Sequence, residues 1–204
     1  MPLLPELQSL VGALKLEADR IGPTRRKQLA VLRRYVAEHK PAHLNFICTH
    51  NSRRSHLGMI WGAVAAYAGG LDHVKTYSGG TEATALNPRM VAALRRAGFQ
   101  IEDPGGNNPR YRITFADDAP PLVCFSKRYN HPANQVQPFA AIMTCDHADS
   151  NCPLIPEADL RLPLTYEDPK AADDTPAEAE RYDERLREIG REVLFGLSTG
   201  KTLR

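Results

Sequence analysis

Eight residues in the first quarter of the chain read Cys48-Thr49-His50-Asn51-Ser52-Arg53-Arg54-Ser55. An apolar run, Leu44-Asn45-Phe46-Ile47, comes directly before them. A segment rich in helix formers and small residues, Leu57 to Ala68, comes directly after. This order predicts a buried strand, a tight loop and a helix.

A loop of this kind is suited to hold a tetrahedral oxyanion. The free N–H groups of the loop and of the first helical turn point at one spot, and the helix dipole adds positive potential there. The same amides would stabilise a thiolate at Cys48 and make it a nucleophile. Arg54 can offer a planar fork of donors to two anion oxygens, and Ser55 can donate to the sulfur. The alternative interpretation is a buried cysteine followed by two solvated arginines.

Length and composition bound the possibilities. A chain of 204 residues with 42% hydrophobic and 25% charged residues is expected to form one compact domain with an appendage. A net charge of +2 argues against nucleic acid or a membrane surface as partner. The chain has neither an apolar stretch near the roughly 18 residues that span a bilayer nor a signal-peptide pattern at its start, so we expect a cytoplasmic protein.

The periodicity along the chain predicts an α/β fold. Residues 1–41 form an N-terminal helical extension with helices over 4–20 and 24–39, residues 42–197 form the main domain, and residues 198–204 form a tail. Strands alternate with helices, which indicates a parallel sheet. The expected strands are 43–49, 73–77, 140–145 and 160–165. A small β insertion is expected from two short runs, 111–115 and 122–126. The final helix is expected to open at Thr175. Loops are expected at 78–82, 127–138 and 146–153.

The Cys-x5-Arg-Ser arrangement between strand and helix resembles the low-molecular-weight protein tyrosine phosphatase superfamily, which includes the thioredoxin-coupled arsenate reductases. The resemblance covers about residues 44–197 and implies a Rossmann-like three-layer domain with a four-stranded parallel sheet. It also implies a set of residues around the oxyanion: Thr49, His50, Asn51, Ser52, Arg53 and Arg54. Asn51 and Ser78 resemble the residues that brace this loop.

A second motif strengthens the resemblance. Cys145-Asp146-His147-Ala148-Asp149-Ser150-Asn151-Cys152 leaves a strand that we expect to end at the same edge of the sheet, and Pro153 follows. Arsenate reductases coupled to thioredoxin carry two further cysteines with this separation. The resemblance implies that Cys48 attacks arsenate, Cys145 displaces arsenite from Cys48, and Cys152 then forms a disulfide with Cys145 that thioredoxin reduces. Two other interpretations are a pair of unreactive cysteines and a zinc site that includes His147.

The proton donor and the departures complete the picture. Asp168-Pro169 follows the last expected strand, where the superfamily carries its catalytic acid. His50 stands where the family has glycine, and Arg53 where many reductases have a spare cysteine. Met59 takes the place of a potassium-binding glutamate found in some reductases. We therefore expect no metal and no cofactor.

The resulting hypothesis is arsenate reduction to arsenite with thioredoxin as reductant. The alternative enzyme is a protein tyrosine phosphatase that uses Cys48, Arg54, Ser55 and Asp168 to form and hydrolyse a phosphocysteine. Its substrate would be a phosphate-type oxyanion in place of arsenate. A third possibility is a non-catalytic module that binds oxyanions or senses redox state.

Overall fold

The computed structural model describes residues 2–134, 136–151 and 155–198. Its centre is a four-stranded parallel sheet in the order β2-β1-β6-β7. The strands are β1 (Ala42–Cys48), β2 (Val74–Gly80), β6 (Phe139–Met143) and β7 (Ala158–Pro163). All five residues of β6 are buried, as expected of a central strand covered on both faces. The predicted Rossmann-like parallel sheet is confirmed.

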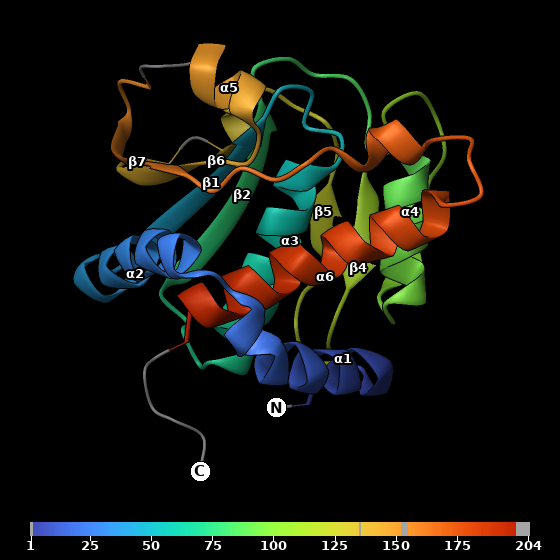
Figure 1. Ribbon diagram of the computed structural model, residues 1–204. Helices are drawn as coiled ribbons and strands as arrows, with labels where there is room; N and C mark the ends of the chain where they lie inside the picture. The colour runs from blue at the N-terminus through green and yellow to red at the C-terminus, as the bar shows by residue number, and fades with distance from the viewer. Residues whose placement is uncertain (1, 135, 152–154, 199–204) are drawn as a thin grey trace.

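One face of the sheet is covered by helix α3 (Arg54–Ala68), which packs on β1 and β2, with α6 (Glu178–Gly196) lying across α3 (Figure 1). The contact between helix and sheet depends on a small residue at Gly58. A Cβ there would lie 2.3 Å from Cδ1 of Phe46 in β1. The helix that follows the cysteine loop is therefore pressed closely against the strand that precedes it.

The N-terminal extension forms two helices, as predicted: α1 (Pro5–Leu16) and α2 (Pro23–Glu38), joined by the 3-10 turn η1 (Glu17–Arg20). Both helices pack on α6 (Figure 1). Their apolar side chains belong to the same continuous core as Trp61 of α3. Helix α2 also contacts β7, so the extension packs on both the last helix and the sheet.

The β insertion is confirmed and contains one strand more than expected. Strands β4 (Tyr111–Thr114) and β5 (Leu122–Cys124) pair antiparallel, and β3 (Gln100–Glu102) joins β4 on its other side. Helix α4 (Pro88–Arg96) precedes this small sheet and packs on α6. Among the described helices, none is both long and apolar enough to cross a lipid bilayer.

The predictions of loops at 78–82 and 146–153 are wrong in part. Ser78 to Gly80 continue β2, because β1 runs on to Cys48 and offers them backbone partners in register. The segment after Cys145 is the short helix α5 (Asp146–Asn151). It forms because the amides of Ala148 and Asp149 find acceptors on Cys145, at Sγ (3.4 Å) and at the carbonyl oxygen (3.0 Å).

Two further predictions need correction. The segment 127–138 contains buried residues and is not simply a surface loop. Lys127 is 4% exposed, and so is Asn134, which ends the 3-10 turn η2 (Pro132–Asn134). The last helix begins at Glu178 and not at Thr175. The Thr175 hydroxyl donates to the carbonyl of Ala172, and the Glu178 carboxylate accepts from the amide of Asp174, so Thr175 does not cap the helix.

Candidate active site

Hydrogen bonds from neighbouring segments hold several carbonyl groups of the loop after β1. The carbonyl oxygens of residues 48, 49, 50 and 52 accept hydrogen bonds from the amides of Thr81, Glu82 and Asn87 and from the hydroxyl of Ser126, at 2.8–3.1 Å. Carbonyl groups held on the outer side leave the loop's N–H groups free to point toward its centre. Neighbouring segments thus hold the loop at four of its carbonyl groups.

Asn51 joins the loop to its surroundings. It has a positive φ of 46°, a conformation that asparagine tolerates better than most residues. Its side-chain amide donates to Ser55 Oγ (2.8 Å) and its side-chain oxygen accepts from the amide of Lys127 (2.9 Å). Ser55 Oγ lies 3.1 Å from Sγ of Cys48. The hydroxyl group next to the Cys48 sulfur is thereby held in a fixed place.

Arg54 and Asp168 form an ion pair beside the loop. Nη2 of Arg54 donates to Oδ2 of Asp168 at 2.7 Å, and Nη1 donates to the carbonyl of Tyr166 at 2.8 Å. Nε of Arg54 is buried and has no hydrogen-bond partner among the described residues. Asp168 also caps the 3-10 turn η3 (Pro169–Ala172) by accepting from the amide of Lys170. The predicted cation and the predicted acid therefore lie at one place.

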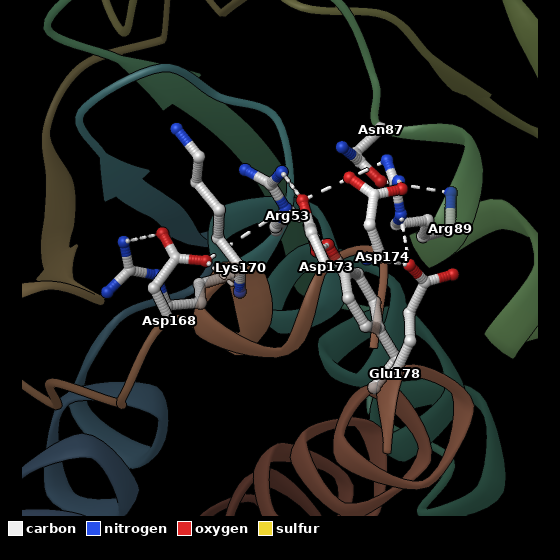
Figure 2. A network of polar contacts seen from close by, with 10 residues as sticks. Arg53, Asn87, Arg89, Asp168, Lys170, Asp173, Asp174 and Glu178 are labelled. Carbon is white, nitrogen blue, oxygen red and sulfur yellow. Dashed lines mark hydrogen bonds and ion pairs between the residues drawn. The ribbon is translucent and has the colours of Figure 1, made fainter. Parts of the chain in front are cut away.

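Arg53 points away from the centre of the loop. Its Nε donates to the hydroxyl of Tyr182 in α6 (2.8 Å), and its Nη2 donates to Asp173 (3.3 Å), as Figure 2 shows for the carboxylate. The Tyr182 hydroxyl donates in turn to Asp173 (2.8 Å), and burial together with this carboxylate raises the pKa of Tyr182 to about 12. Nε of Arg53 also lies 3.9 Å from Oδ1 of Asp168, so the side chain of Arg53 ties the segment that carries Asp168 to the loop.

The same network extends to α4. Arg89 donates to Glu178 (2.6 Å) and to Asp174 (2.5 Å), next to Asp173 (Figure 2). These charged contacts hold the segment between β7 and α6 at both ends. Sequence reasoning missed them because the residues come from distant parts of the chain.

The second cysteine lies at the loop. Cys145 is buried, and it belongs with Cys48 to one apolar cluster on the face of the sheet opposite α3. Its Sγ lies 3.4 Å from Oγ1 of Thr49, the residue that follows Cys48. The third predicted cysteine, Cys152, lies outside the described residues. Cys48, Cys124 and Cys145 are all free thiols.

Behind the loop lies a buried polar cluster that the sequence did not reveal. Ser78 Oγ lies 3.1 Å from Nδ1 of His56, and Nζ of Lys127 lies 3.5 Å from the same hydroxyl. Burial and the charge of Lys127 hold the pKa of His56 well below its ordinary value. Ser78 therefore supports the first turn of α3 through His56.

Two further expectations concern His50 and metal binding. The side chain of His50 is 53% exposed and lies 3.8 Å from Glu82, so the residue that replaces the family's glycine points outward. Within the described part of the chain, no group of three or more potential ligands could hold a metal ion.

Comparison with known proteins gives the family. No protein-family model matches the chain. The chain is 31% identical to an arsenate reductase of Bacillus licheniformis and 30% identical to one of Bacillus subtilis, in each case over 157 residues that make up 76% of this chain and 95% of the relative.

Solved structures support the fold. A low-molecular-weight phosphotyrosine phosphatase from Vibrio cholerae aligns with a TM-score of 0.50 at 14% identity, covering 76% of this chain and 93% of that one. A YwlE mutant from Bacillus subtilis aligns with a TM-score of 0.51 at 17% identity, covering 76% and 95%. The chain shares the fold of these structures and belongs to the arsenate reductase family of enzymes.

Proposed function

We propose that this protein reduces arsenate to arsenite through three thiols, Cys48, Cys145 and Cys152, and that thioredoxin supplies the electrons. The observation that carries the proposal is the place of Cys145. Its sulfur is buried in one cluster with Cys48 and lies 3.4 Å from the hydroxyl of Thr49. Hydrolysis of a phosphate ester does not require a second thiol in this cluster.

In the first step the Cys48 thiolate attacks arsenic and an arsenic–oxygen bond breaks. The departing oxygen takes a proton from Asp168, and the other oxygens bind to the loop amides and to Arg54. Arg54 donates to Asp168 at 2.7 Å. The incoming oxyanion would therefore share the guanidinium with the acid that protonates its leaving oxygen.

In the second step the Cys145 thiolate attacks Sγ of Cys48. The electron pair of the sulfur–arsenic bond leaves with arsenic, which becomes arsenite, and a disulfide joins the two cysteines. Cys152 then attacks Cys145 and frees Cys48, and thioredoxin reduces the Cys145–Cys152 disulfide by exchange. The short helix α5 separates the last two cysteines in sequence, so this proposal requires α5 to move or unwind.

Phosphotyrosine hydrolysis is the second candidate. The phosphatase-like fold and the arrangement of Cys48, Ser55, Arg54 and Asp168 favour it, because the same residues can form and hydrolyse a phosphocysteine. In that case Cys145 and Cys152 would at most protect Cys48 from over-oxidation.

The two candidates are separated by one experiment. Arsenate, thioredoxin, thioredoxin reductase and NADPH are supplied to the wild type, to Cys152→Ser and to the control Cys124→Ala, and hydrolysis of p-nitrophenyl phosphate is followed in parallel. The control removes a buried thiol that the relay does not use. We expect steady NADPH consumption with the wild type and the control, and at most one turnover with Cys152→Ser. Full turnover by Cys152→Ser would refute the relay, and phosphate ester hydrolysis without arsenate reduction would favour the phosphatase.

A further inference from the structure

The hydroxyl of Thr49 lies between two groups that can exchange a proton. Its Oγ1 is 3.4 Å from Sγ of Cys145 and 3.2 Å from Nδ1 of His147. Both partners belong to one short segment: Cys145 follows β6, and His147 lies in the first turn of α5. The thiol is buried, whereas the histidine is exposed to solvent.

A hydroxyl has a single proton to donate, so its two contacts are linked. When Thr49 donates to Nδ1 of a neutral His147, its oxygen can accept the S–H of Cys145. When Thr49 donates to a Cys145 thiolate, its oxygen can accept from a protonated Nδ1. The two arrangements differ by a proton moved from sulfur to imidazole, and they need almost no movement of heavier atoms.

We propose that His147 takes the proton of Cys145 through the Thr49 hydroxyl and so prepares the second thiol for its attack on Cys48. This inference rests on the proposed arsenate reductase function and concerns only its second step. His147 acts through Thr49 and does not itself touch the reacting sulfur. Neither the residue pattern around Cys48 nor the phosphatase chemistry requires a base at this position.

The step balances as a proton transfer followed by a displacement. The proton of Cys145 passes to Oγ1 of Thr49 while the hydroxyl proton of Thr49 passes to Nδ1 of His147, which leaves a thiolate and an imidazolium. The thiolate then forms the bond to Sγ of Cys48, and arsenic leaves with the electron pair of its bond to that sulfur. The amide of Ala148 donates to Sγ of Cys145 at 3.4 Å and would stabilise the thiolate in the meantime.

Other charges near this relay are largely paired. On α5, Asp149 forms an ion pair with Arg161 of β7 at 2.6 Å, and Asp146 is exposed next to His147. From the loop side, His50 lies 3.8 Å from Glu82. A pH profile must therefore be compared with that of a variant that lacks only the imidazole.

The test measures one step in a background that stops there. Cys152→Ser is mixed with arsenate, quenched in acid at short times and alkylated, and the Cys48–Cys145 disulfide is quantified by mass spectrometry between pH 6 and 9. The same background carries His147→Asn, His147→Ala or the matched control Ser150→Ala, an exposed residue of the same helix. Asparagine keeps an acceptor for the Thr49 hydroxyl but cannot take up a proton.

We expect His147→Asn and His147→Ala to slow disulfide formation at pH 7 by about 100-fold, a typical contribution of a general base. Both should recover part of the rate at higher pH, whereas Ser150→Ala should match its parent. An asparagine variant with the rate and pH profile of the parent would overturn the proposal, because hydrogen bonding alone would then suffice. If the parent itself forms no disulfide, the proposed function fails and this inference fails with it.

Discussion

Replacement of Lys127 by methionine is expected to stabilise the protein at neutral pH. Lys127 is 4% exposed, and the nearest groups to its ammonium are uncharged: the hydroxyl of Ser78 and the carbonyl of Phe125 lie 3.5 Å away, and the ring centroid of Phe125 lies 4.6 Å away. Arg110, which stacks on the same ring, adds a like charge. Burial lowers the pKa of Lys127 from its ordinary 10.5 to about 8. A methionine fills similar space and carries no charge.

The size and the sign follow from that pKa. Because the folded-state value is below the unfolded one, the unfolded chain binds more protons between about pH 8 and 10.5. The free energy of unfolding therefore increases as the pH rises through that range. Below pH 8 the full difference, about 3 kcal/mol at roughly 1.4 kcal/mol per pKa unit, opposes folding. Cys124 acts in the other direction above pH 9, since burial raises its pKa from 9.0 to about 12.

Urea unfolding with reducing agent present, at pH 7 and pH 9, tests this reasoning. We expect Lys127→Met to be more stable than the wild type by about 2 kcal/mol at pH 7, because the lost ammonium contacts offset part of the gain. The advantage should shrink by about 1 kcal/mol at pH 9. Lys75→Met, which changes an exposed lysine of β2, should show no such trend. A variant that is destabilised equally at both pH values would refute the account of Lys127.

Three further changes probe the loop and its acid. In Gly80→Ala the new Cβ would lie 2.6 Å from the carbonyl oxygen of Thr49, so the loop must shift. We expect the inhibition constant of phosphate to rise at least about tenfold and the melting temperature to fall. Ser55→Ala removes the hydroxyl 3.1 Å from Cys48, and we expect single-turnover reaction with arsenate to slow about tenfold, as suits a hydrogen bond to a charged group; an unchanged rate would mean that the serine has no part in the attack. Asp168→Asn removes the acid, and we expect kcat to fall about 100-fold while phosphate binds no more weakly, since the arginine loses its internal partner; an unchanged kcat would exclude Asp168 as the proton donor.

Local patterns were sufficient to predict most of the fold. The apolar strands alternate with amphipathic helices, and this alternation alone indicates a parallel sheet. The extent of β2 could not be predicted, because Ser78, Gly79 and Gly80 have the composition of a turn. They are held extended by backbone pairing with the end of β1, a tertiary effect that outweighs local propensity.

Some residues of the candidate site could likewise be predicted from the sequence, and others could not. The spacing of Cys48 and Arg54 and the Asp168-Pro169 pair could be read directly from the chain. The loop supports Asn51 and Ser78 were also predicted, but Ser126 and Lys127 were not, because they lie about 75 residues away in segments that were assigned to the β insertion and to a surface loop. The outward direction of Arg53 was equally hidden, since it depends on Tyr182 and Asp173 in the last part of the chain.

A stoichiometric reaction tests most directly which cysteine attacks Cys48. Cys152→Ser is given one equivalent of arsenate without thioredoxin, and the products are analysed by peptide mapping and by quantifying arsenite. The account predicts one arsenite per protein and a disulfide that joins Cys48 to Cys145. Arsenite release without this disulfide, or a disulfide that joins Cys48 to Cys124, would contradict it.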